Sequence, residues 1–384
     1  MTRLPDGRYV DDAPFDPEAS LLELERKDLD APNWLLIWRK FKTHKLGLAS
    51  GIFLLFSYLM LPFAGFIAPY GPNTRHADHL YAPPQSVNFF HEGEFIGPFV
   101  YPVESEANLE TFQWEFVADT DNPAKLKFFC EGDSYMLAGL IRADTHLFCA
   151  PEDVTVFVWG SDRLGRDVFS RIFYGAQLSL TVGLIGITVS FVLGIFFGSL
   201  AGYFGGKTDW LINRMIEILR SLPELPLWLA LSAAVPSNWS PAAVFFIISI
   251  ILGILDWPGL ARSVRAKFLS LREEEYVRAA EMMGASSGRV IRKHLLPNFM
   301  SHLIASATLS IPAMILGETA LSFLGLGLRA PAVSWGVMLN DAQNLTSVEI
   351  YPWIAIPMIP IIVVVLAFNF LGDGLRDSLD PYQQ

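Results

Sequence analysis

The chain has 384 residues, of which 52% are hydrophobic and 17% charged, and its formal net charge at pH 7 is −11. Its mean hydropathy is +0.36, and its charged fraction falls below the roughly 25% typical of soluble globular proteins. The negative charge, together with the lack of any stripe of lysine and arginine, excludes nucleic acid as an expected partner. The apolar residues gather in long runs, which is typical of membrane-spanning helices.

Six such runs, separated by polar segments, predict an all-α membrane protein with six transmembrane helices. They cover residues 46–69, 176–203, 211–235, 242–260, 299–326 and 353–370. Each approaches or exceeds the roughly 20 residues that a helix needs to cross the hydrocarbon of a bilayer. The N-terminal segment 1–45 is polar and charged and shows no signal-peptide pattern. We therefore expect the first run to stay as an anchor.

Orientation is predicted from the basic residues, which favour the cytoplasmic side. They concentrate in segment 1–45 and in the loop 261–298, so both termini, including the tail 373–384, are expected inside. Within residues 33–45, four apolar side chains share one helical face beside several lysines and arginines: Trp34, Leu35, Trp38 and Phe41. This pattern favours an interfacial helix on the inner leaflet, although a cationic flank of the first span is an alternative.

The polar segment 70–157, between the first two spans, is predicted to be a small β-rich periplasmic insert. Residues 112–117 and 124–129 alternate apolar and polar side chains, with a turn signal at 119–123 between them. The two cysteines of the chain, Cys130 and Cys149, both lie here. In an oxidising compartment they could form a disulfide, worth about 3 kcal/mol in the chain-entropy model. Two free thiols are the alternative, and we expect the bridge.

The loop 261–298 carries the strongest signal. Its first half is charged and helix-prone, and Gly284 can end a helix in the left-handed conformation. A second short helix is expected to follow, and Pro297 to end it before the fifth span. Ala279 and Ala280 give a small face that allows close packing. A helix–glycine–helix hairpin is typical of a docking device, whereas a merely solvated loop would not need this ordered spacing.

This loop resembles the cytoplasmic coupling loop of permeases of binding-protein-dependent ABC transporters, whose pattern runs Glu-Ala-Ala, Gly and Ile-x-Leu-Pro at fixed spacing. Arg278 stands where that pattern has Glu, and His294 where it has Ile, so any glutamate-specific salt bridge is in doubt. The resemblance implies contacts with an ATPase subunit by residues of this loop. They are Tyr276, Arg278, Ala279, Ala280, Gly284, Ala285, Arg289, Leu296 and Pro297.

Three more segments resemble the C-type permease of dipeptide and oligopeptide importers: residues 160–171, 318–327 with 334–336, and 371–381. The resemblance covers about 33–69 and 158–381 and leaves the insert unexplained. It implies a type I ABC importer permease fold, with the permease domain at 158–372. It also implies periplasmic or gating residues, for which the candidates are Asp162, Gly165, Arg166, Asp167, Glu318, Trp335 and Gly336.

The implied partners are a sister permease, two cytoplasmic ABC ATPase subunits, a periplasmic solute-binding protein and the lipid of a bacterial inner membrane. ATP and Mg²⁺ would be bound by the ATPase subunits, so this chain is expected to hold no cofactor and no metal and to be no enzyme. Its Gly206–Thr208 stretch is not a phosphate-binding loop, because Ala201 stands where the first glycine is required. Peptides are the expected substrates, with oligosaccharides, opines or metal complexes as alternatives.

Two other classes of protein compete with this interpretation. An ion-coupled secondary transporter would need several acids inside its spans, and only Glu318 is a serious candidate, since Asp256 is expected near the inner face. A membrane-anchored enzyme would need chemistry in the insert, whose histidines match no metal motif: His76, His79, His91 and His146. Gly194, Gly198 and Gly202, on the second span, indicate close helix packing.

Overall fold

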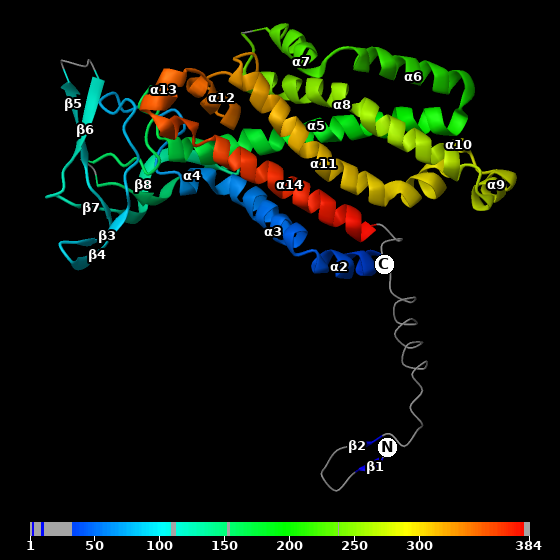
Figure 1. Cartoon of the computed structure of the whole chain (residues 1–384), viewed down its shortest axis with the longest axis horizontal. Helices are drawn as coiled ribbons and strands as arrows, with labels where there is room; N and C mark the ends of the chain where they lie inside the picture. The colour runs from blue at the N-terminus through cyan, green and yellow to red at the C-terminus, as the bar shows by residue number, and fades with distance from the viewer. Residues whose placement is uncertain are drawn as a thin grey trace.

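The structure, a computed structural model, describes residues 2–3, 9–10, 33–108, 113–151, 154–236 and 238–379. Long helices form a bundle, and short strands lie at one end of it, called here the strand end (Figure 1). The opposite end carries the short helix α9 (Glu275–Met282) and is called the α9 end. Near the N-terminus, β1 (Thr2–Arg3) pairs antiparallel with β2 (Tyr9–Val10). The rest of segment 1–32 and residues 380–384 of the predicted tail lie outside the described residues.

Five segments of the described chain are long and apolar enough to cross a membrane, so the chain is a mostly helical, multi-pass membrane protein. The first, Lys45–Ile67, comprises α3 (Lys45–Met60), the 3-10 turn η1 (Leu61–Phe63) and α4 (Ala64–Ile67). The next two are α5 (Val168–Phe204) and α8 (Pro241–Leu271). The fourth joins α10 (Ser287–Val290), the π-helical turn η2 (Ile291–Leu295) and α11 (Leu296–Phe323). The last joins η4 (Pro352–Ala355) to α14 (Met358–Leu379).

The predicted span 211–235 is wrong as a single helix. The chain there forms α6 (Gly206–Ser221) and the short apolar α7 (Glu224–Ala233), with extended backbone at Leu222 between them. Polar residues recur along one side of α6: Asp209, Asn213, Glu217 and Arg220. Pro223 lacks an N–H and disfavours helical backbone in the residue before it, which is why the helix stops at this point.

Helices α5 and α8 lie in close contact because glycines face α8 at the point of approach. A Cβ on Gly194 would lie 2.9 Å from the side chain of Leu260, and one on Gly198 would lie 2.6 Å from the carbonyl oxygen of Ala261. A Cβ on Gly202 would likewise meet Phe268 at 2.6 Å. The glycine stripe therefore serves helix packing, as its spacing predicts.

Residues 33–45 form a separate helix, α2 (Asn33–Thr43), before the first span. His44 ends it and caps α3, since its Nδ1 accepts a hydrogen bond from the Gly47 N–H at 2.9 Å. Trp38 stacks on Phe41, and the Lys42 amine lies over the Trp38 ring. The amphipathic face thus belongs to a helix of its own rather than to a flank of α3.

The described part of the insert between the first two spans contains seven strands: β3 (Asn88–His91), β4 (Glu94–Val100), β5 (Val103–Asn108), β6 (Gln113–Ala118), β7 (Ala124–Lys125), β8 (Lys127–Leu137) and β9 (Ile141–Cys149). All pair antiparallel, in the groups β3-β4-β7, β5-β6 and β8-β9. A disulfide joins Cys130 of β8 to Cys149 of β9.

The strand patterns at 112–117 and 124–129 are found as β6 and as β7 with the start of β8, while Phe112 itself lies outside the described residues. The turn signal between them is also present, because the Asp119 carboxylate accepts the Asp121 N–H at 3.0 Å. However, β6 pairs with β5, and β7 pairs with β4. Alternation along a strand identifies its buried face but not its partner, which tertiary packing decides.

Candidate functional site

The loop predicted at 261–298 forms a compact helical hairpin at the α9 end. Helix α8 runs on to Leu271, beyond the predicted end of its span, because Val264 and Phe268 are buried against the following hairpin. Helix α9 ends at a turn in which the Ala285 N–H donates to the Ala280 carbonyl at 3.1 Å. Gly284 has φ +82° within this turn, and nothing lies near the place of its missing Cβ. Glycine is therefore required by backbone conformation and not by crowding.

Helix α9 has one buried and one exposed face. Ala280 is buried, and Val277 packs in a cluster with residues of the neighbouring helices: Leu260, Val264, Phe268, Leu271, Val290, Leu295, Phe299 and Leu303. On the other side Met282 is 89% exposed, Met283 83% and Tyr276 40%, and Ala279 is exposed beside them. We call these four residues the α9 surface. Large apolar side chains so exposed in a charged segment mark a contact surface, and methionine adapts well to a partner.

The predicted coupling residues do not all face outward. Exposed at this end are Tyr276, Arg278, Ala279, Gly284, Arg289 and Pro297, whereas Ala285 and Leu296 are half-buried and Ala280 is buried. Met282 and Met283 are missing from the predicted set. A signal for them was present, since two adjacent methionines stand between the charged Glu281 and the glycine that ends the helix.

The expectation that Pro297 ends the second short helix is wrong. Helix continues from α10 through η2 into α11, and Pro297 lies in the first turn of α11. The Leu296 N–H donates to the Ile291 carbonyl, five residues back, which is the π-helical pattern. Such a turn changes the local hydrogen bonding just where proline lacks its own donor, so the helix tolerates Pro297.

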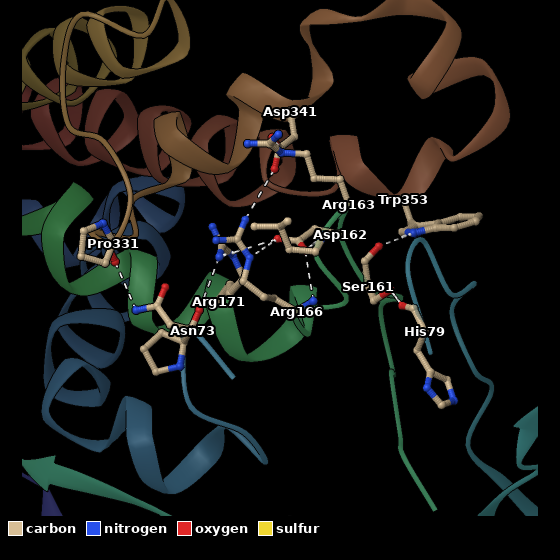
Figure 2. A network of polar contacts seen from close by, with 12 residues as sticks. Asn73, His79, Ser161, Asp162, Arg163, Arg166, Arg171, Pro331, Asp341 and Trp353 are labelled. Carbon is tan, nitrogen blue, oxygen red and sulfur yellow. Dashed lines mark hydrogen bonds and ion pairs between the residues drawn. The ribbon is translucent and has the colours of Figure 1, made fainter. Parts of the chain in front are cut away.

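At the strand end, the predicted gating residues of the 160–171 segment lie in one tight ionic loop (Figure 2). Asp162 accepts the backbone N–H groups of Leu164 and Arg166, at 2.9 and 3.0 Å. Its other oxygen lies 2.7 Å from Arg166 Nε and 3.6 Å from Arg171 Nη1. The Asp162 and Arg166 side chains are only 8% and 6% exposed. This set of donors offsets the cost of burying the carboxylate.

Gly165 and Asp167 fix the same loop to its surroundings. Gly165 has φ +68°, and a Cβ there would lie 2.0 Å from the His76 carbonyl oxygen. The Asp167 carboxylate caps helix α5 by accepting the Ser170 N–H at 2.8 Å, so α5 begins at Val168, before the predicted boundary of its span. Burial raises the pKa of Asp167 to about 7, although its hydrogen bonds from Ser170 oppose the shift.

A third arginine, Arg163, joins this loop to the segment that follows α11. Arg163 Nε lies 2.7 Å from Asp341, which begins the 3-10 turn η3 (Asp341–Gln343). Arg166 Nη2 reaches the other oxygen of Asp341 at 3.7 Å. Burial raises the pKa of Asp341, while Arg163 and Arg166 favour its charged form. The ionic loop thus holds the start of α5 against the segment that follows α11.

A polar cavity of about 590 Å³ opens beside these contacts. Four arginines line it together with the single acid Asp341: Arg75, Arg163, Arg166 and Arg329. Asn73 lies at the edge of the cavity, where its side-chain amide donates to the Pro331 carbonyl at 3.2 Å (Figure 2). The cavity is therefore positively lined in a chain whose net charge is −11.

The remaining predicted gating residues meet where α11 ends. Glu318 is fully buried, and its Oε1 accepts the hydroxyls of Ser322 at 2.7 Å and Ser334 at 2.8 Å. Ser334 also caps α12 (Trp335–Asn340). Glu318 Oε2 has no hydrogen-bond partner among the described residues. The acid thus ties α11 to the segment that packs back onto it.

Trp335 and Gly336 complete that junction. The Trp335 indole donates to the Ile172 carbonyl of α5 at 3.0 Å, and its backbone N–H donates to the Ser179 hydroxyl at 3.0 Å. A Cβ on Gly336 would lie 2.8 Å from the Thr319 backbone. The structure therefore brings all seven predicted residues to one region at the strand end, in two clusters, and the polar cavity is lined by Arg166 of the first cluster and by Ser322, the partner of Glu318 in the second.

Comparison with known proteins identifies the class of this membrane protein. The family model of the binding-protein-dependent transport system inner membrane component matches residues 194–383. The N-terminal TM domain of oligopeptide transport permease C matches residues 33–84. Residues 85–193 lie between the two matches, and the insert is therefore largely outside both.

Individual relatives agree with these models. The chain is 43% identical over 224 residues to the dipeptide transport system permease protein DppC of Bacillus subtilis (strain 168), covering 58% of this chain and 68% of the relative. It is 41% identical over 224 residues to the oligopeptide transport system permease protein OppC of Haemophilus influenzae, covering 58% and 70%. The chain belongs to the family of binding-protein-dependent transport system inner membrane components, as a permease of the dipeptide and oligopeptide type.

Among solved structures, inward-facing MetNI methionine ABC transporter aligns with a TM-score of 0.43 and 19% identity, covering 54% of this chain and 96% of that chain. This likeness is too weak to support any argument about the present fold.

Proposed function

We propose that this chain forms half of the translocation pathway of a peptide importer and docks an ATPase subunit through its α9 surface. The observation that carries this proposal is the exposure of Met282 and Met283 on a rigid hairpin among charged residues. The names of the relatives, dipeptide and oligopeptide permeases, support peptides as the substrates. The other partners in the proposal are a sister permease, a second ATPase subunit and an external solute-binding protein.

The proposed topology has six crossings, of which α6 and α7 together make the third. Asp209, near the start of α6, pairs with Arg265 close to the α9 end of α8. At the other extreme, the Ser232 hydroxyl near the end of α7 donates to the Leu326 carbonyl, beyond α11 at the strand end. The two helices follow one another along α8 (Figure 1). Together α6 and α7 cross the thickness of the membrane, which neither crosses alone, and the break between them lies at Pro223.

In this topology the α9 end is cytoplasmic and the strand end periplasmic, in a bacterial inner membrane. Basic side chains gather around the α9 end: Arg262, Arg265, Lys267, Arg272, Arg278, Arg289, Arg292 and Lys293. Six crossings place both termini on that same side, and the contact of Gly47 with Gly374 supports this, since it joins the start of α3 to the last turns of α14. The basic residues then obey the positive-inside rule.

ATP and Mg²⁺ belong to the partner ATPases in this mechanism, and the chain itself performs no hydrolysis. ATP binding closes the ATPase pair, and the α9 hairpin transmits that movement because Val277 packs with residues of α8, α10 and α11. The bundle then shifts from an inward-open to an outward-open population. At the strand end, the ionic loop and the arginine-lined cavity lie where the binding protein delivers its ligand.

The test is purification of the whole assembly in mild detergent, followed by an assay of peptide-stimulated ATP hydrolysis. We expect a sister permease and ATPase subunits to co-purify, and the double variant Met282→Asp/Met283→Asp to lose them. Leu345→Asp is the matched control and should retain the ATPases, because Leu345 is 83% exposed and lies at the strand end, in the short helix α13 (Leu345–Ile350). Retention of active ATPases by the double variant would refute the docking role. A known ABC importer, purified in the same detergent, is the control for the assembly. If that importer stays intact and the wild-type chain purifies alone, the importer assembly is refuted.

A further inference from the structure

The hairpin of β8 and β9 carries an apolar tip that no contact within the described chain covers. Its turn lies between Leu137 and Ile141. Leu140 is 82% exposed, Ile141 63% and Met136 54%. Water disfavours such a group of large apolar side chains at a single protruding point, so the tip needs an apolar environment.

The hairpin runs alongside the end of the first span rather than above it. His146 contacts the Ala68 carbonyl through Nδ1, just beyond the span. One turn deeper, the Tyr135 ring packs directly on Gly65. Deeper again, the Ala138 N–H of the turn donates to the Pro62 carbonyl at 3.3 Å. The tip therefore lies beside η1, inside the segment Lys45–Ile67 that crosses the membrane.

The depth of the tip matches that of an interfacial segment. A helical rise of about 1.5 Å per residue places Pro62 roughly 7 Å below Ile67, and amphipathic segments bury their apolar faces about 5–10 Å into the headgroup and acyl boundary. The neighbouring span is itself open to lipid, because only 17% of its apolar window is buried and Phe56, Leu59 and Phe63 are exposed. In Figure 1, α3, α4 and β8 lie at one edge of the bundle.

We propose that the β8–β9 tip inserts into the nearer leaflet of the bilayer and anchors the insert to the membrane surface, with Met136, Leu140 and Ile141 among the lipid. Arg142 follows Ile141 and is exposed, and its long stem lets the guanidinium reach a headgroup phosphate while the tip is submerged. The disulfide joins the two strands at the end remote from the turn, which keeps them together as the tip enters the lipid.

The test uses spin-label accessibility in the full transporter, reconstituted in nanodiscs. The two natural cysteines are bridged, so Leu140→Cys introduces the single thiol of this chain for a nitroxide, and the partner chains must be free of labelled thiols. Asp121→Cys, in the exposed turn between β6 and β7, is the matched control. We expect the ratio of oxygen to water-soluble nickel-chelate accessibility to be several-fold higher at position 140 than at position 121.

Ile141→Cys provides a second, independent position and should give the same ratio as Leu140→Cys. A label at both tip positions that prefers the nickel chelate would show the tip in water and overturn the proposal. Low accessibility to both reagents would show that a protein partner, such as the sister permease or the binding protein, covers the tip, and this would also overturn it.

Discussion

Removal of the Arg166 side chain should destabilise the protein far more than removal of Arg163, although both belong to the same ionic loop. Arg166 is 6% exposed and pairs with the equally buried Asp162. Arg163 is 57% exposed, and its partner Asp341, 11% exposed, keeps Arg166 Nη2 at 3.7 Å when Arg163 is removed. Loss of one partner from a buried ion pair costs about 3–5 kcal/mol, whereas an exposed pair is worth about 0–1 kcal/mol.

For Arg166→Ala we expect a cost at the lower end of the range for a buried ion pair, about 3 kcal/mol. Arg171 remains 3.6 Å from the Asp162 carboxylate, and two backbone N–H groups still donate to it. A loss of about 3 kcal/mol corresponds to a fall in Tm of roughly 5–10 °C for a domain of a few hundred residues. Arg163→Ala should change Tm by about 3 °C or less on the same scale.

The assay is thermal unfolding of the purified transporter in detergent, followed by the loss of the monodisperse peak. Arg166→Lys keeps a positive charge beside Asp162 and Asp341, so it should lose less Tm than Arg166→Ala. Equal Tm values for Arg166→Ala and Arg163→Ala would refute the argument from burial.

Three further predictions follow from single features. Gly284→Asp should uncouple transport from ATP hydrolysis while the chain still inserts, because φ +82° is strained for a side chain by about 1–2 kcal/mol; undiminished peptide uptake would contradict this. Since the pKa of Asp167 is raised to about 7 by burial, the contribution of this residue to stability should be full below about pH 4 and be lost as the pH rises to about 7, so the difference in Tm between the natural chain and Asp167→Asn should shift in favour of the variant across this range. Thiol reagents should label Cys130 and Cys149 of the denatured protein only after reduction, which mass spectrometry can check.

Much of the bundle could be predicted from the sequence because lipid imposes a simple rule, namely long apolar helices with their backbone groups satisfied internally. The glycine stripe on α5 and the turn at Gly284 were also predictable, since each depends on a local requirement for a missing Cβ. The third span was not, because its average hydropathy concealed an amphipathic half and a proline break at Pro223.

Contacts between distant segments could not be predicted from local patterns. The pairing of Arg163 with Asp341 and the approach of Gly165 to the His76 carbonyl depend on how the insert and the segment after α11 pack against α5. The partner of β6 depended in the same way on the whole insert. Motif resemblance identified the residues of the ionic loop, but only the three-dimensional arrangement shows that Asp162 is the acceptor that holds it together.

The most direct test of the docking role of α9 is site-specific photocrosslinking in intact cells. A photoreactive amino acid at Met282 should crosslink to an ABC ATPase subunit, and the same group at Met136, at the opposite end of the bundle, should not. An ATPase adduct at position 282 alone is the result we expect. If the assembly co-purifies intact but position 282 yields no ATPase adduct, the α9 surface is not the docking site and the proposed coupling route is wrong.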